Sequence, residues 1–300
     1  MNVEIQCVAD SRDSLGEGCL WDGVTQSLWW LDIARPSRIH CFNPVTGEKR
    51  VWTSTILLTA IARRRNGGFL VTGEDGLYFF DETSGAIAPF VKLASNFPAN
   101  RFNDGACDSR GRFWAGTMMQ NIGPDGEDLD ITADQGELLR VAANGDATSM
   151  VQNIAVTNGP CWSPDGRIFY FSDSRKQLIY AFDFDADEGR LSNQRVLNDT
   201  RKHGYPDGAT VDTEGFIWSA RWEGACVLRI DPKGRITSVV PMPASRPTCI
   251  CFGGPQLTTA YVTSSRAHMD AATLQRYPQQ GGVFAFEPGV KGQLKNSFAG

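Results

Sequence analysis

Short apolar segments separated by tight polar turns recur along the whole chain, and several of them share one spacing. The best copies place a polar residue, a glycine three positions later and an aromatic residue three positions after that, as in DSRGRFW (108–114), SPDGRIF (163–169) and DTEGFIW (212–218). A weaker copy and two variants are RRRNGGFLV (63–71), WDGVTQSLWWLD (21–32) and CFGGPQLTTAYVT (251–263). Each predicts a strand, a tight turn and a second strand rich in aromatic and β-branched residues.

A second type of segment alternates with the first: an apolar strand that ends in a glycine-containing turn. Its six copies are residues 38–47, 76–85, 136–145, 177–189, 225–234 and 281–290. Two strand pairs recur about every 45 residues, which is the length of a four-stranded propeller blade. The pattern therefore predicts a single six-bladed β-propeller domain over residues 1–300. The strand-like segment 3–9 is left over, and we expect it to pair as the outer strand of the sixth blade and close the ring. Residues 270–277 are expected to form one or two helical turns.

Composition and charge narrow the function classes. The net charge is −5 and both signs are scattered, which argues against a nucleic-acid binder with a basic stripe and against a membrane-surface patch. Eight dispersed cysteines predict reduced, mostly buried thiols. With neither a signal-peptide pattern nor an apolar run of ~20 residues, we expect a cytoplasmic protein, as a monomer or small homo-oligomer.

Polar residues recur at one position of the repeat. Counting back eight residues from the turn glycine of three repeats reaches Asn103, Asn158 and Asp207, so all three are predicted to lie at the start of an inner strand. In a propeller these starts surround one mouth of the central channel. Glu17, in the string LGEG, has a similar place although its turn is longer, and Arg101 shares the face of Asn103 by strand alternation.

Oxygen-donor side chains that converge on one axis suit a divalent cation, and the candidate set is Glu17, Asn158 and Asp207, with Asn103 next. The alternative is that NDG, TNGP and PDG are ordinary turn strings. That interpretation fits Asp212, which occupies the turn position of its repeat. The coincidence of one repeat position in three blades favours a site for Asp207.

Six segments in the expected order resemble the SMP-30/regucalcin/gluconolactonase family, and look most like its bacterial sugar lactonases: LGEG (15–18), RFNDG (101–105), FWAGTM (113–118), TNGPCWSPDG (157–166), YPDGATVDTEGFIWSA (205–220) and FGGPQLTTAYVTS (252–264). The resemblance implies a six-bladed propeller with one divalent metal ion in the channel. It implies metal ligands at Glu17, Asn158 and Asp207 and substrate contacts at Arg101 and Asn103. The metal is left open among calcium, manganese, magnesium, zinc and iron(II).

Several relatives carry an acidic sugar-contacting residue shortly after the GTM string, where this chain has Gln120 and Asn121. These two residues are therefore predicted to contact the substrate instead. The expected reaction is metal-dependent hydrolysis of an aldono-lactone such as L-arabinono-, D-xylono-, D-galactono- or gluconolactone, with Asp207 as general base.

Two other functions remain open at this point. One is a calcium-binding or regulatory propeller without turnover. The other is an aryl-ester or phosphotriester hydrolase on the same scaffold, which predicts a more apolar channel rim than Arg101, Asn103, Gln120 and Asn121 suggest. The sequence contains no HExxH, GxSxG, Walker or GxGxxG string that would indicate a different chemistry.

Overall fold

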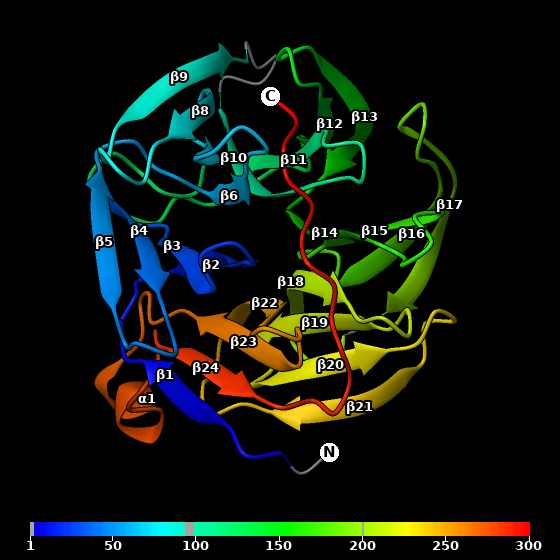
Figure 1. Ribbon diagram of the computed structural model, residues 1–300. Helices are drawn as coiled ribbons and strands as arrows, with labels where there is room; N and C mark the ends of the chain where they lie inside the picture. The colour runs from blue at the N-terminus through cyan, green and yellow to red at the C-terminus, as the bar shows by residue number, and fades with distance from the viewer. Residues whose placement is uncertain (1–2, 94–98, 200) are drawn as a thin grey trace.

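The strands form six four-stranded antiparallel sheets arranged in a ring (Figure 1). The computed structural model describes residues 3–93, 99–199 and 201–300. From inner to outer strand, the first three blades are β2 (Gly16–Asp22), β3 (Ser27–Asp32), β4 (Ser37–Phe42) and β5 (Lys49–Ser54); β6 (Ala60–Arg63), β7 (Phe69–Thr72), β8 (Gly76–Phe80) and β9 (Ile87–Lys92); and β10 (Asn100–Cys107), β11 (Phe113–Met119), β12 (Gly136–Val141) and β13 (Ala147–Ile154).

The remaining three blades repeat this arrangement. They are β14 (Thr157–Trp162), β15 (Ile168–Asp173), β16 (Leu178–Asp185) and β17 (Arg190–Asp199); β18 (Tyr205–Val211), β19 (Ile217–Trp222), β20 (Cys226–Ile230) and β21 (Ile236–Pro241); and β22 (Pro247–Gly253), β23 (Thr259–Ser264), β24 (Val283–Phe286) and β1 (Gln6–Ala9). Each inner strand contacts the inner strands of its two neighbours, so the ring is closed around a central channel. The predicted six-bladed β-propeller is confirmed.

The ring closes where the sequence predicted. Strand β1 pairs antiparallel with β24, with Gln6 opposite Ala285 and Cys7 opposite Phe284, and is the outermost strand of the last sheet. The predicted helical turns are α1 (Ala271–Arg276), whose N-cap Asp270 accepts a hydrogen bond from the backbone N–H of Thr273. Within the described ranges, no helix is long and apolar enough to cross a membrane.

The repeat aromatic residues account for packing between blades. Trp114 of the third blade lies 5.2 Å from Phe169 of the fourth, and Trp218 of the fifth lies 5.9 Å from Phe252 of the sixth, measured between ring centroids. All four rings are buried. Each pair belongs to a separate buried apolar cluster between neighbouring sheets, in which the large rings fill the space between the blades. All eight cysteines are free thiols, and all but Cys7 are buried.

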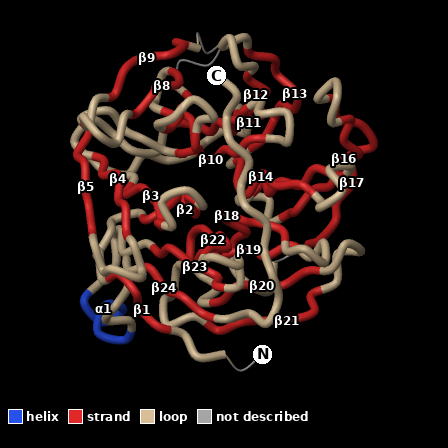
Figure 2. The backbone as a smooth tube through the Cα atoms, in the orientation of Figure 1, coloured by secondary structure: helices blue, strands red, loops and turns tan. Residues whose placement is uncertain are grey.

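The last residues of the chain form no strand, and they cross one mouth of the ring (Figure 1, red; Figure 2, tan). We call residues 290–300 the C-terminal strap. It is attached to several blades: the N–H of Gly292 donates to the carbonyl of Leu257 at 2.8 Å, and the N–H of Phe298 donates to the carbonyl of Arg63 at 2.8 Å. Phe298 itself is fully buried. The opposite mouth is not crossed by this segment and holds the candidate site.

Candidate metal and substrate site

Five of the six inner strands carry a β-bulge near their start. The pairing with the second strand shifts between Glu17 and Leu20 in β2, and similarly between residues 102 and 105 in β10, 158 and 161 in β14, 206 and 209 in β18, and 247 and 250 in β22. No shift occurs in β6. A bulge inserts an extra residue and changes the direction of local side chains. This irregularity places polar side chains of several blades at the same channel mouth.

Six of the seven sequence-predicted site residues line one cavity of about 280 Å³: Glu17, Arg101, Asn103, Asn121, Asn158 and Asp207. They come from four inner strands or the loop after β11, and the inner-strand residues lie near the strand starts. The same cavity is lined by Leu15, Ile33, Met118, Ile131, Val156, Ser174, Arg175, Tyr205, Pro206 and Trp222. The repeat spacing selected Asn103, Asn158 and Asp207, and the fold brings these three together with the other predicted residues from distant parts of the chain.

The two candidate acidic ligands are buried and close to each other. Glu17 is 8% exposed and Asp207 is 6% exposed, and their carboxyl groups are in hydrogen-bond contact. Burial raises the pKa of Asp207 well above its ordinary value, and the neighbouring Glu17 carboxylate raises it further. Burial likewise raises the pKa of Glu17. Two like charges in a desolvated position are unfavourable unless a proton or a cation lies between them.

A network of side-chain hydrogen bonds joins the other predicted residues. Asn103 Nδ2 donates to Asn158 Oδ1 at 2.8 Å, and Arg101 Nη1 donates to Asn103 Oδ1 at 2.8 Å. Arg101 also donates from Nε and Nη2 to Asn121 Oδ1, at 2.9 and 2.7 Å. Burial lowers the pKa of Arg101 to about 10, which leaves the guanidinium charged at neutral pH. The network fixes a positive charge beside the two carboxylates.

Gln120 does not share this position. Its side-chain Nε2 donates to Glu74 Oε1 at 2.6 Å, and it is not among the residues that line the cavity. Asn121, the next residue, lines the cavity and holds Arg101. The substrate contact predicted for Asn121 is thus compatible with its place in the structure, whereas the one predicted for Gln120 lacks that support.

Sequence reasoning missed several residues in the channel and at this mouth. Asp104 is the most informative: its carboxylate accepts the backbone N–H of Gly159 at 2.8 Å and of Gly105 at 2.7 Å, and its charge acts on Glu17 and Asp207. Strict strand alternation assigns neighbours to opposite faces, and the bulge in β10 breaks that rule. The aromatic wall formed by Tyr205 and Trp222 was also missed. These two residues are direct partners on β18 and β19, and YPDG and SARW contain no signal that marks them.

The donor set fits a hard divalent cation. Two buried carboxylates and the amide oxygen of Asn158 belong to three different blades and face one cavity. Asn158 is held in place by its own Nδ2, which donates to Ser174 Oγ at 2.8 Å. In the described part of the chain, no three His, Cys, Asp or Glu side chains form a metal-binding group. A cation at this site would therefore rely on the amide oxygen as well as the carboxylates.

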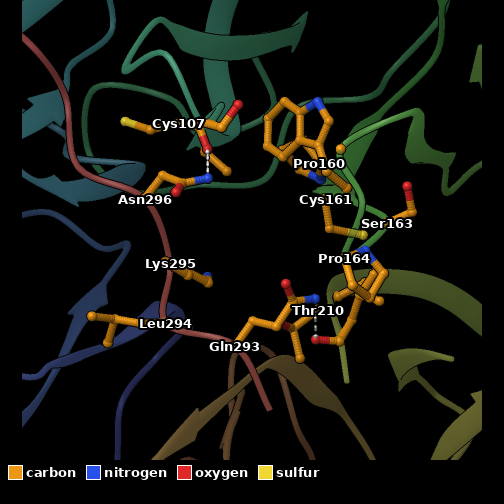
Figure 3. A pocket seen from close by; sticks show the side chains of 16 residues that line it. Cys107, Pro160, Cys161, Ser163, Pro164, Thr210, Gln293, Leu294, Lys295 and Asn296 are labelled. Atoms are coloured by element: carbon orange, nitrogen blue, oxygen red, sulfur yellow. Dashed lines mark hydrogen bonds between the residues drawn. The ribbon is translucent and has the colours of Figure 1, made fainter. Parts of the chain in front are cut away.

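A second cavity of about 170 Å³ lies at the other mouth (Figure 3). It is lined by the far ends of inner strands, including Cys107 and Val211, and by Gln293, Leu294, Lys295 and Asn296 of the C-terminal strap. Because the first cavity is lined near the starts of the same strands, the two cavities open toward opposite ends of the channel.

Fold and site together define a β-propeller with an oxygen-rich polar cavity at one mouth. Comparison with known families gives a more specific result. Residues 15–266 match the SMP-30/Gluconolactonase/LRE-like region, and the chain belongs to this family.

Known relatives match over the whole chain. A protein of Pseudomonas putida named 6-deoxy-6-sulfogluconolactonase is 34% identical over 302 residues, with 100% of both chains covered. Regucalcin of Oryctolagus cuniculus is 34% identical over 306 residues, covering 100% of this chain and 99% of the relative. Among solved structures, a calcium-binding protein, regucalcin, from Agrobacterium tumefaciens is similar with a TM-score of 0.89 and 30% identity, covering 99% of this chain and 97% of the other.

Proposed function

We propose that the protein hydrolyses a sugar lactone to the corresponding aldonic acid, with a divalent cation bound at the mouth of the channel. The observation that carries this proposal is the buried contact between Glu17 and Asp207 in the cavity that also contains the Arg101–Asn103–Asn121 network. Membership of the SMP-30/gluconolactonase family and the lactonase name of one full-length relative support the same reaction class.

Glu17, Asn158 and Asp207 would hold the cation, and calcium, manganese, magnesium, zinc and iron(II) all remain compatible with an all-oxygen donor set. When bound, such an ion polarises a carbonyl oxygen and lowers the pKa of coordinated water. The charge of the ion would also remove the electrostatic cost of placing two carboxylates together, which gives this pair a reason to be buried.

Asp207 is the proposed general base. As water attacks the lactone carbonyl carbon, the Asp207 carboxylate accepts a proton from that water while the new carbon–oxygen bond forms. The ring carbon–oxygen bond then breaks, and the proton passes to the ring oxygen, which becomes a hydroxyl group of the acid. Arg101 and Asn103 would orient the lactone, because their hydrogen bonds to each other and to Asn121 fix their direction.

The aromatic wall would bind the apolar face of the sugar ring. Trp222 lines the cavity next to Tyr205, and Arg246 lies 4.7 Å from the centroid of the Trp222 ring. That cation–π contact orients the indole, so the aromatic wall is preformed before the substrate binds.

A second candidate is hydrolysis of aryl esters or phosphotriesters at the same site. The observation in its favour is the apolar part of the rim, which includes Leu15, Ile33, Met118, Ile131 and Val156. A rim of this kind suits an uncharged aromatic leaving group better than a fully hydroxylated ring.

One experiment separates the candidates. The purified protein is stripped with a chelator, its metal content is verified, and acid release is measured with L-arabinono-, D-xylono-, D-galactono- and gluconolactone before and after refilling with each metal. An aryl ester and an organophosphate are assayed in parallel. We expect lactone hydrolysis that disappears on stripping and returns with a divalent ion. Unchanged hydrolysis after verified stripping contradicts the metal mechanism, and cation binding without any turnover favours a calcium-binding module.

A further inference from the structure

The C-terminal strap lies between two fixed attachments and carries four side chains across the channel. Before the crossing, the N–H of Thr213 donates to the carbonyl of Lys291 at 2.9 Å. After it, Arg65 donates its N–H to the carbonyl of Phe298 at 2.9 Å. Between these points, Gln293 to Asn296 line the cavity at this mouth (Figure 3). The path of the strap is therefore determined by blades on opposite sides of the ring.

Lys295 is the charged residue of this crossing segment. Its Nζ donates to the carbonyl oxygen of Cys19 at 2.9 Å, which ties the ammonium group to β2 only two residues from Glu17. Lys295 lines the cavity at this mouth and also a further one of about 220 Å³, whose lining includes Trp21 and Ile61. In the described part of the chain, no Asp or Glu oxygen lies within 4.0 Å of this ammonium group. Its charge therefore acts through space rather than in a contact ion pair.

Asp104 is the carboxylate that connects this charge to the candidate site. Both of its oxygens accept backbone N–H groups, from Gly159 beside Asn158 and from Gly105. Burial raises the pKa of Asp104, and Lys295 opposes this rise. Burial works against the Lys295 ammonium, but the charge interactions with Cys249, then Cys19 and then the carboxylate of Asp104 raise the pKa of Lys295 above its ordinary value. The ammonium is thus charged inside the channel.

We propose that Lys295 weakens cation binding at the site: its ammonium, held against β2 two residues from Glu17, repels a cation bound by Glu17, Asn158 and Asp207 and keeps that cation exchangeable. The inference rests on the proposed cation site. Repulsion between two charges scales with their product, so the effect grows with the charge of the ion. Because the ammonium lies inside the channel, added salt screens it less than it screens a surface lysine.

The test measures cation binding rather than turnover. Dissociation constants for Mn²⁺ and Tb³⁺ are determined by calorimetry and by luminescence, at constant ionic strength, for the chelator-treated wild type and for Lys295→Met, Lys295→Gln and Lys295→Arg. Lys295→Gln keeps a neutral N–H donor at this position, on a side chain one atom shorter than lysine, and thermal unfolding checks that each variant is folded. Lys291→Met, at an exposed position of the same strap, is the matched control.

We expect the two neutral variants to bind Mn²⁺ about tenfold more tightly and Tb³⁺ about thirtyfold more tightly, because the repulsion removed is proportional to the ionic charge. Lys295→Arg and Lys291→Met should remain within about twofold of the wild type, since both preserve the charge in the channel. Unchanged or weaker binding by a folded neutral variant overturns the inference while leaving the cation site intact, and so does an equal factor for both ions. A wild type that binds neither ion overturns the cation site and the inference together.

Discussion

The two aspartates of YPDGATVDTEGFIWSA allow a direct test, because their predicted substitution effects are opposite. Asp212 is fully buried and supports the blade. Its Oδ1 accepts the N–H groups of Glu214 and Phe216 at 3.0 and 2.9 Å, and its Oδ2 accepts Trp218 Nε1 at 2.9 Å and Arg229 Nε and Nη2 at 3.0 and 2.8 Å. Asp212→Ala leaves a buried indole N–H and part of a guanidinium group without an acceptor.

The expected cost of Asp212→Ala is about 3–5 kcal/mol in the free energy of unfolding, the range for breaking a buried charged pair from one side. At about 2 °C per kcal/mol for a domain of this size, the melting temperature should fall by about 6–10 °C. Asp207→Asn should instead leave the metal-free protein as stable as the wild type or about 1 kcal/mol more stable, because it replaces a buried carboxyl group whose ionised form is disfavoured by burial and by Glu17. Loss of the general base should lower kcat by about 10²–10⁴-fold.

Both variants are compared with the wild type by thermal and urea unfolding in the presence of chelator, and by initial rates of lactone hydrolysis with metal added. Asp108→Ala serves as a second scaffold control, since Asp108 accepts Trp114 Nε1 and Arg112 Nε in the third blade in the same way. The distinction between scaffold and site is wrong if Asp207→Asn destabilises the fold as much as Asp212→Ala, or if it retains full activity.

Two further predictions concern the substrate side of the cavity. Arg101→Lys should lower kcat/KM by about 10–100-fold with little change in cation affinity, because a lysine cannot bridge Asn103 and Asn121 at once. Steady-state kinetics and calorimetry of cation binding check this prediction, and an equal loss of cation binding would contradict it. Trp222→Leu should raise KM for sugar lactones about 5–20-fold while kcat changes less, since a stacking interaction worth about 1–1.5 kcal/mol is lost. A decrease in kcat alone would argue against a role of Trp222 in substrate binding.

Much of the fold could be predicted because each blade is a local structure. A glycine with φ of +83° at Gly111 and +85° at Gly215 closes the repeat turn, and the aromatic residue three positions later faces the next blade. These are short-range requirements, so the same residue types recur at the same positions of each repeat. The pairing of β1 with β24 could be predicted because the N-terminal strand has no partner among the six repeats.

The repeat predicted part of the candidate site, and the family resemblance added Asn121. Asn103, Asn158 and Asp207 share a repeat position and line one cavity, as expected. Asp104 was missed because a β-bulge brings an adjacent side chain to the same channel. Lys295 was missed because the strap lies outside every repeat, and its contact with Cys19 joins residues 276 positions apart. No spacing rule operates over such a distance.

The pairing of β1 with β24 also has a consequence for how the nascent chain is made. The first strand leaves the ribosome long before its partner is synthesised, so the sixth blade lacks its outer strand until residues 283–286 emerge. Until then β1 and the incomplete sixth sheet have unpaired edges, which can pair with strands of other incompletely folded chains. Blades one to five need no such delay, because all their strands are consecutive in the sequence. A truncation inside β24 should therefore give five folded blades and an aggregation-prone product rather than a smaller stable protein.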